Sequence, residues 1–319
     1  MRRPRSDRMP LGAPGIWHLI SRCVRRAHFL DGPGRREWLA ERFAAWFDLL
    51  AVDCLAYALM GNHIHLVVRT RPDLAAKWSD AEVTRRFLAM RSVQNGAPGV
   101  VARTQIRSAG MGVQALREAR KALAHPGAMM RAVKEGFARR VNQEEQAAGH
   151  VWESRYQDVA VIDAGGAFAC VVYVDLNPFR AGLVKDPVKS LFCSAAHRQG
   201  VRAEAADHAL AERVCILQGH PMLDSKGRPE GSWEWTAADI AAVTAATARL
   251  IRTGKGILPT WADELLPRLG IRSEHWAAAF GRGGVMTGNV IGSYASRRKL
   301  AGAGRLASDK TGLFGQVAP

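Results

Sequence analysis

The sequence contains no uninterrupted apolar run of about 18 residues, the shortest stretch that usually spans a bilayer as a helix. Its basic first ten residues, MRRPRSDRMP, are not followed by the apolar segment of a secretory signal. We therefore expect a cytoplasmic protein that is not exported and has no membrane partner.

Cysteine is also scarce, with five residues and no C-x-x-C pair. An odd, scattered set argues against a disulfide framework or a zinc ribbon and fits a reducing compartment. The sequence also lacks a G-x-x-x-x-G-K-[ST] phosphate loop, so no nucleotide cofactor is expected. The cysteines are Cys23, Cys54, Cys170, Cys193 and Cys215.

Acidic residues are few relative to basic ones: 29 Asp and Glu stand against 45 Lys and Arg, for a formal charge of +16. A field of this sign attracts polyanions, so nucleic acid is the first partner to consider. The alternative is a basic surface that serves only solubility. A membrane surface fits less well because no basic amphipathic helix with an aromatic face is evident.

The periodicity of apolar residues predicts strands and helices in alternation up to about residue 200, and mostly helices after it. Residues 71–128 are harder to interpret, with one helix at 79–91 followed by a Gly-rich stretch that could be a loop or an insertion. Strands are predicted within 15–30, 53–70 and 150–163, and helices at 34–51, 129–145, 165–184 and 236–251. The 165–184 helix should stop at Pro178, and Thr236 and Asp239 have the spacing of a capping box.

The segment LMGNHIHLVV, residues 59–68, places two histidines one residue apart in an apolar run. In a strand, His63 and His65 project to the same side while Ile64 points into the core. Two imidazoles on one face can hold a divalent ion, whereas the alternative needs a separate backbone carbonyl for each ring. Metallo-β-lactamases need H-x-H-x-D-H, which is absent, and the other histidines do not suit an amidohydrolase barrel.

One of only four tyrosines, Tyr173, lies in the predicted helix segment VVYVDLNP, with Asn177 one turn later on the same face. This face could present a hydroxyl nucleophile beside an oxygen ligand. Equally, Tyr173 could be half-buried packing and Asn177 a residue that ends the helix before Pro178.

LMGNHIHLVV, HVWESRYQDVAVID and YVDLNPFRAGLV, in this order, resemble the REP-associated tyrosine transposases, a branch of the HUH single-strand-DNA transposases. WHLISRCVRRAHFL near the N-terminus is also similar to this family, and the resemblance covers roughly residues 15–195. The chain departs from the family pattern at Gly61, where Pro is frequent, and at Asp175, where His is frequent.

The resemblance implies an α+β fold, a ferredoxin-like HUH palm with a central antiparallel sheet, to which the sequence adds a mostly α-helical C-terminal region. The catalytic domain would span residues 1–200, with 71–128 as a possible insertion, and a helical accessory region with a basic tail would span 201–319. By the same resemblance His63 and His65 bind Mg²⁺ or Mn²⁺, Tyr173 is the nucleophile, and Asn177 is a third ligand or an orienting group.

The implied activity is transposase chemistry: cleavage of single-stranded or hairpin DNA through a 5′-phosphotyrosine intermediate, by a nucleoid-associated monomer or homodimer. Candidate DNA contacts are Arg180, Arg131, Lys134, Arg139, Arg140, Arg155, Arg297 and Arg298. The basic residues could instead form solvated faces. Trp152 and Tyr156 could stack on bases, although aromatic residues in strands more often pack inward.

Two other functions remain open. A nucleic-acid-binding protein could keep this scaffold without cutting, and a metallohydrolase could use bound water as the nucleophile, in which case Tyr173→Phe stays active. The C-terminal region could read DNA, form a packing layer or make a dimer contact.

Overall fold

A computed structural model describes residues 9–94, 111–198, 208–215, 221–223, 229–253, 262–269, 271, 276, 280 and 290–291. Its centre is a five-stranded sheet of order β2-β3-β1-β4-β7. The strands are β1 Gly15–Arg22, β2 Val52–Leu59, β3 His63–Thr70, β4 Gln157–Val161 and β7 Val290–Ile291. The first four in this order pair antiparallel, and β7 joins β4 in parallel. The expected α+β class with a central antiparallel sheet is confirmed.

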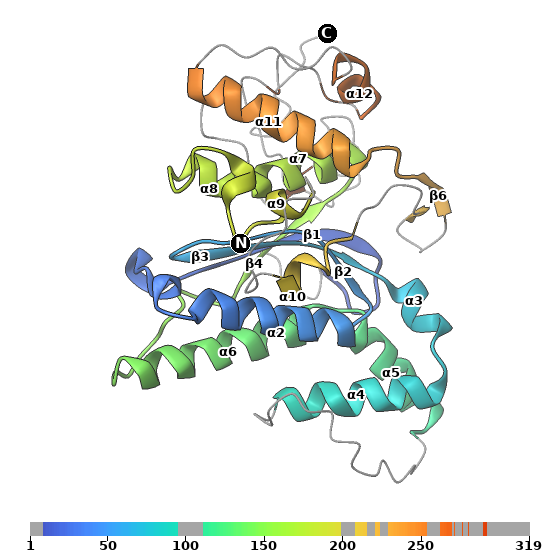
Figure 1. The fold of residues 1–319 in the computed structure, drawn as a ribbon. Coiled ribbons are helices and arrows are strands. Elements are labelled where there is room, and N and C mark those ends of the chain that lie inside the picture. Colours follow the sequence, from blue (N-terminus) through green and yellow to red (C-terminus); the bar gives the residue numbers. More distant parts are fainter. Residues whose placement is uncertain are drawn as a thin grey trace.

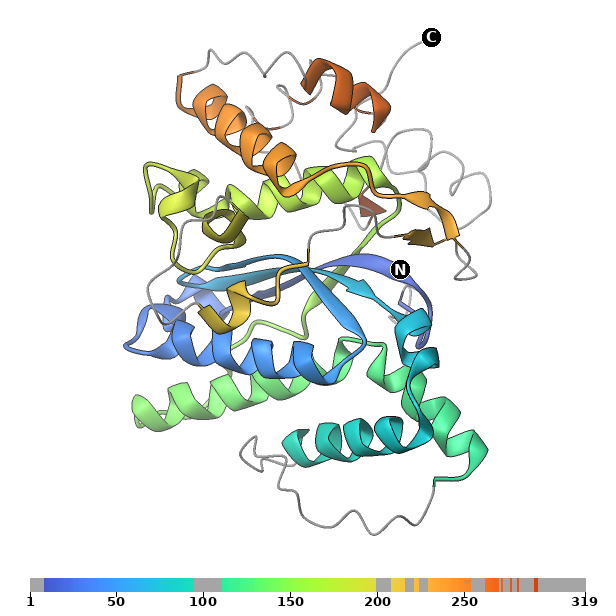
Figure 2. The same cartoon turned by 45° about the vertical axis from the view of Figure 1, so that its right-hand side comes forward.

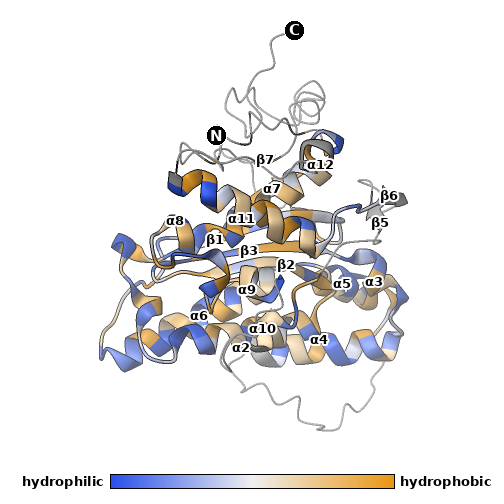
Figure 3. Ribbon diagram, turned by 45° about the horizontal axis from the view of Figure 1, so that its top comes forward, coloured by the Kyte–Doolittle hydropathy of each residue, from blue (hydrophilic) through white to orange (hydrophobic). Residues whose placement is uncertain are grey.

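Side chains alternate between the two faces of the sheet along each strand, and both faces are buried because a packed layer covers each of them. On β3, Ile64, Leu66 and Val68 enter the core beneath the sheet, as expected for Ile64, and Val67 enters the core above it. Figure 1 shows the resulting layers, with α2 Arg35–Leu49 and α6 Gly127–Glu144 on one side and α7 Ala164–Asp175 on the other. In Figure 3, α7 and the strands are largely apolar, while the helices of the opposite layer carry many hydrophilic residues.

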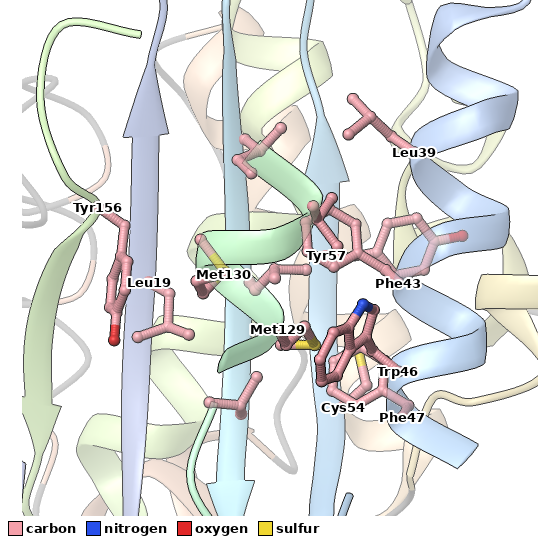
Figure 4. Packing of buried hydrophobic residues seen from close by; sticks show 14 of the residues in the cluster. Leu19, Leu39, Phe43, Trp46, Phe47, Cys54, Tyr57, Met129, Met130 and Tyr156 are labelled. Atoms are coloured by element: carbon pink, nitrogen blue, oxygen red, sulfur yellow. The ribbon is translucent and has the colours of Figure 1, made fainter. Parts of the chain in front are cut away.

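The lower core holds the sheet against α2 and α6. Phe43 and Trp46 of α2 meet Met129 and Met130 of α6 over the strand residue Tyr57, as Figure 4 shows. All five side chains are nearly inaccessible to solvent. Each buried large apolar side chain contributes roughly 1.5–3 kcal/mol of transfer free energy, so this core fixes the sheet that carries the histidines.

Within 71–128, the possible insertion, the described residues before α6 form helices at one end of the sheet: α3 Pro72–Lys77, α4 Asp80–Gln94 and α5 Val113–Leu123. The two ends of this segment lie close together, since Ala51 accepts a hydrogen bond from Arg71 N and donates one to Leu123 O. Much of the Gly-rich stretch lies outside the described residues.

The upper layer combines α7 with residues from the C-terminal part of the chain, as the turned view in Figure 2 also shows. Helix α11 Ala237–Thr253 contacts α7, and Trp235 and Trp276 pack against Phe168 of α7. The capping box is confirmed: Asp239 N donates to Thr236 Oγ1, and Thr236 N to Asp239 Oδ2.

The remaining elements are short. Two strands, β5 Pro221–Leu223 and β6 Pro229–Ser232, form a small second sheet in a region predicted to be mostly helical. The others are η1 Val24–Arg26, η2 Phe29–Asp31, α8 Asn177–Arg180, η3 Pro187–Lys189, α9 Ser194–Arg198, α10 His208–Ala211 and α12 Ala262–Arg268. Among the helices of the described ranges, none has the length and apolar character to cross a membrane.

Candidate functional site

The two histidines of the H-x-H segment lie at the start of β3, on the face that packs against α7. Their ring centroids are 4.9 Å apart; His65 is buried and His63 half-buried. Strand β3 begins immediately after the Gly61–Asn62 turn, which closes with Met60 N donating to His63 O. A Cβ atom on Gly61 would lie 2.5 Å from a carboxylate oxygen of Asp31, so a larger residue there would require the Asp31 side chain to move.

The proton position on His63 follows from its neighbour Asn62. Asn62 Nδ2 donates to the Arg26 carbonyl at 3.1 Å, which identifies Oδ1 as the amide atom 2.6 Å from His63 Nδ1. A carbonyl oxygen can only accept, so His63 carries its proton on Nδ1. Its Nε2 lone pair is therefore available to a ligand.

A third histidine, which the sequence analysis did not single out, completes the cluster. His18 of β1 is fully buried, and its Nε2 lies 2.8 Å from His65 Nδ1. The two rings stack with centroids 5.0 Å apart. His18 lies between Ile16 and Ile20 on the same face of β1, in what looks like an ordinary apolar strand. Only the β1–β3 register, which places Ile20 opposite His65, reveals the contact between His18 and His65.

Tyr173 of α7 lies over this cluster. Its ring meets the rings of His65 and His18 edge-on, with centroid distances of 5.9 Å and 6.0 Å. The structure therefore brings Tyr173 next to His65, which neighbours His63, and the roles of these residues remain predictions.

Burial sets the protonation states of the cluster. It lowers the pKa of His18 to about 3 and that of His63 to about 4, and lowers the pKa of His65 well below its usual value. Burial also raises the pKa of Tyr173, an effect that nearby Arg180 and Arg22 oppose. At neutral pH the site consists of neutral imidazoles beside a protonated phenol.

Asn177 begins α8 directly after the Leu176 cap of α7. Its Nδ2 donates to the backbone carbonyl of Tyr173 at 3.0 Å, which leaves Oδ1 outside that hydrogen bond. The helix was predicted to continue to Pro178, but α7 ends at Asp175, and Pro178 lies in the first turn of α8, where a missing N–H costs nothing. The side chain of Asn177 thus stabilises the end of the tyrosine helix.

Two arginines flank the tyrosine. The Arg180 guanidinium lies 5.9 Å from the Tyr173 ring centroid, and its Nη1 donates to the Phe280 carbonyl. Arg22 stands opposite His63 in the β1–β3 register. None of the groups that shift the pKa of His63, His65 or Tyr173 is a carboxylate of the described residues. The site is therefore electropositive and suited to an anion.

Asp175, which stands where the family often has His, is a structural residue here. It is buried, and Arg198 Nε donates to its Oδ2 at 2.8 Å while Ser194 Oγ donates to its Oδ1 at 2.5 Å. Arg198 also donates to the Leu55 carbonyl of β2. The carboxylate thus joins the end of α7 to α9 and to the sheet.

The candidate DNA contacts on α6 lie away from the tyrosine. Arg131 and Arg139 are exposed on α6, in the layer opposite α7, and Arg140 pairs with Glu144 there. Lys134 is buried, with its Nζ donating to the Ser154 carbonyl, so it does not belong to an exposed basic face.

Arg155, in the loop before β4, is exposed. Trp152 and Tyr156, which flank Arg155, are buried, as expected for core residues rather than stacking platforms. Arg297 and Arg298 lie outside the described residues.

The donor set fits a divalent ion in part. Both His63 and His65 are neutral, and both use Nδ1 in a hydrogen bond, so Nε2 is the nitrogen of each ring that remains for an ion, provided that it carries no proton. Across the described ranges no group of three or more His, Cys, Asp or Glu side chains is arranged to hold a metal. Besides the two imidazoles, an ion could bind water, substrate oxygens or an amide oxygen such as Oδ1 of Asn177.

No protein-family model matches the chain, and no curated protein does. Among solved structures, the chain is similar to a REP-associated tyrosine transposase bound to a REP hairpin, with a TM-score of 0.35 and 14% identity. The similarity covers 60% of this chain and 84% of that one. A TM-score and an identity at this level do not establish a common fold.

Proposed function

We propose that this protein is a metal-dependent single-strand DNA endonuclease and strand transferase, a transposase that acts through Tyr173 on hairpin-forming DNA. The observation that carries the proposal is the contact of Tyr173 with His65, which neighbours His63, at a site whose charged neighbours Arg22 and Arg180 are both cationic. Such a site suits a phosphodiester better than a neutral or cationic substrate. The order of the three sequence motifs supports the same chemistry.

In the proposed reaction the Tyr173 hydroxyl attacks the scissile phosphorus. The new bond joins the phenolic oxygen to the 5′-phosphate, the bond from phosphorus to the 3′ oxygen breaks, and the phenolic proton leaves as the 3′-OH gains one. The energy of the phosphodiester is kept in the tyrosine ester for rejoining. No nucleotide cofactor is needed.

The residues around the phenol favour this reaction electrostatically. Arg22 and Arg180 stabilise the phenolate, as their effect on the Tyr173 pKa indicates, and their charges also suit the phosphate oxygens. Mg²⁺ or Mn²⁺ held by His63 and His65 would neutralise charge on those oxygens and polarise the phosphoryl group. The hydrogen bond from Asn177 to the Tyr173 carbonyl would hold the end of α7 in place.

The proposal extends to the scaffold. We infer that β1, α2, β2, β3, α6 and β4 form the ferredoxin-like palm of this enzyme class. The antiparallel order β2-β3-β1-β4, with both connecting helices on one face, supports this inference.

The test is a covalent-adduct assay. The purified protein, with Mn²⁺, is incubated with a labelled library of single-stranded DNA hairpins and separated on denaturing gels. We expect a protein–DNA band that is lost in Tyr173→Phe and in the His63→Ala/His65→Ala double variant. Tyr156→Phe, a buried tyrosine of the opposite core, is the matched control and should keep the band.

Two outcomes would overturn the proposal. Tight hairpin binding without any adduct or cleavage would indicate a DNA-binding protein on this scaffold. Cleavage that persists in Tyr173→Phe would indicate a hydrolase that uses bound water.

A further inference from the structure

His18 is a costly residue in its position. It is a polar side chain buried in the middle of β1, and its Nδ1 has no hydrogen-bond partner among the described residues. Burying an unpaired polar atom is unfavourable, and an apolar residue in its place would pack against Val67 and α7 without this cost. The contact that His18 does make, to His65, is therefore the feature to explain.

The hydrogen bond between His18 Nε2 and His65 Nδ1 joins two rings that are both neutral. One nitrogen must donate and the other accept, so the pair has two possible arrangements. If His18 donates, the proton of His65 is on Nε2 and that nitrogen cannot ligate an ion. If His65 donates, its Nε2 carries a lone pair, as Nε2 of His63 does.

The structure assigns His18 the role of a positioning residue: its Nε2 accepts a hydrogen bond from His65 Nδ1 and so presents Nε2 of His65 as a ligand beside Tyr173. This inference rests on the proposed function, because only there does Nε2 of His65 serve as a metal ligand. It would make the two ligating histidines equivalent, since each then donates from Nδ1 to a neighbour, His63 to Asn62 and His65 to His18. A histidine ligand usually has such a partner, which fixes its tautomer and orientation.

The ring geometry supports a positioning role. His18 stacks on His65 with an interplanar angle of 25°, and both rings meet Tyr173 edge-on. His18 therefore restrains the orientation of the His65 ring as well as its tautomer. Neither Ile16 nor Ile20, its neighbours on the same face of β1, could do so, because they offer no acceptor.

The first measurement is the tautomer of His65 in the metal-free protein, from the ¹⁵N chemical shifts of its ring nitrogens, with His65→Gln used to assign the signals. We expect the proton on Nδ1 in the wild type, and a shift toward the Nε2-protonated form in His18→Leu, which offers no acceptor. A wild-type His65 protonated on Nε2 would overturn the inference. This readout depends neither on a bound ion nor on activity.

The second measurement is Mn²⁺ affinity by calorimetry for the wild type, His18→Leu and His18→Gln, with thermal unfolding to show that each variant is folded. Loss of a hydrogen-bond partner to a ligating histidine typically weakens affinity about 10–100-fold, and we expect this loss for leucine. Glutamine can accept through its amide oxygen and should keep most of the affinity. A folded leucine variant with wild-type affinity would contradict the role of His18.

The two proposals fail separately. A wild type that forms the tyrosine adduct but protonates His65 on Nε2 would refute the role of His18 and leave the proposed function standing. A wild type that protonates His65 on Nδ1 but forms no adduct would support the role of His18 in setting the tautomer and refute the proposed function.

Discussion

At the scale of single residues, Asp175 should matter more to stability than any surface carboxylate. It neutralises Arg198 inside the protein, where both side chains are almost completely buried. We expect Asp175→Asn to lower the free energy of unfolding by about 3–5 kcal/mol, because it leaves a buried charge unpaired. Chemical denaturation measures this change.

The control is Asp80→Asn, which removes an exposed partner of Arg120 and should cost about 0–1 kcal/mol. Replacing both buried partners, as in Asp175→Leu with Arg198→Met, should recover much of the loss. A loss for Asp175→Asn no larger than that for Asp80→Asn would show that the buried pair does not hold α7.

The buried histidines make a second prediction, on acid stability of the metal-free protein. The pKa of His18 is about 3 and that of His63 about 4 in the folded state, against about 6.5 when unfolded. Between these values the unfolded chain binds more protons, so stability should fall as pH drops below about 6.5. The fall attributable to His18 should end near pH 3.

Each pKa unit corresponds to about 1.4 kcal/mol, so the contribution of His18 is on the order of a few kcal/mol. Urea unfolding between pH 7 and pH 4, with a chelator present, should show a shallower decline for His18→Leu than for the wild type. Parallel curves for the two proteins would mean that His18 is not kept neutral by the fold.

Which site residues could be predicted depended on whether the signal was local. Strand periodicity places His63 and His65 on one face within one element, whereas Tyr173 was joined to them by the order of the three family-like motifs. His18 was missed because its importance comes from pairing across strands 47 residues apart. Lys134 was misplaced because helical periodicity does not reveal which flank of a basic helix another segment covers.

At the scale of elements, α7 depends on a close contact at its first turn. A Cβ atom on Gly165 would lie 2.1 Å from the Leu269 carbonyl oxygen, a backbone atom that cannot rotate away. Gly165→Ala should therefore separate α7 from the C-terminal residues and lower the free energy of unfolding by about 1–3 kcal/mol. Gly112→Ala, at the N-cap of α5, where a Cβ would meet nothing within 4 Å, is the control for adding a methyl group without a clash.

If Gly165→Ala were as stable as Gly112→Ala, the contact between α7 and Leu269 would be dispensable. Intrinsic propensity alone predicts the opposite result, because alanine is the better helix former by about 1 kcal/mol. The experiment therefore distinguishes packing from propensity by the sign of the change.

Element types were predicted better than element ends. Apolar periodicity predicted β1, α2, β2, β3, α4, α6 and β4 in their order, but not α3 and α5 within 71–128, and the strand predicted within 150–163 is only Gln157–Val161. Before β4 the backbone is not part of this strand, and individual side chains are buried instead. Trp152 is one of them, and its Nε1 donates to the Lys134 carbonyl. Such contacts between distant segments set element ends, and a sequence pattern does not contain them.

At the scale of the whole molecule, the sheet separates two surfaces with different expected roles. The exposed Arg131 and Arg139 of α6 lie in the layer opposite Tyr173. We expect Arg131→Glu/Arg139→Glu to leave the rate of adduct formation at saturating DNA unchanged, whereas Arg180→Met should lower it at least tenfold. A slowed reaction at saturation in the α6 variant would place the DNA across both layers.

The C-terminal part of the chain contributes the residues that cover the outer face of α7, the helix that carries Tyr173. Trp235 and Trp276 pack on Phe168, and the Phe280 carbonyl accepts from Arg180. The sequence predicted helices here but could not say what they cover, because their partners lie more than 60 residues away. Of the three roles left open for this region, a packing layer is the one that these contacts show.

A chain ending at residue 198 should therefore fail to fold cooperatively. Without these C-terminal residues, the apolar outer face of α7 would be exposed to water, which costs roughly 25 cal/mol of folding free energy for each Å² uncovered. Strand β4 would also lose its parallel partner β7. We expect broad thermal unfolding, binding of a hydrophobic dye and no DNA adduct. A chain ending at residue 291, which keeps every described element, is the control and should unfold as sharply as the full chain. Sharp unfolding of the shorter chain at the full-length midpoint would instead make residues 9–198 a domain in their own right, and the C-terminal contacts would then serve another purpose than holding Tyr173 in place.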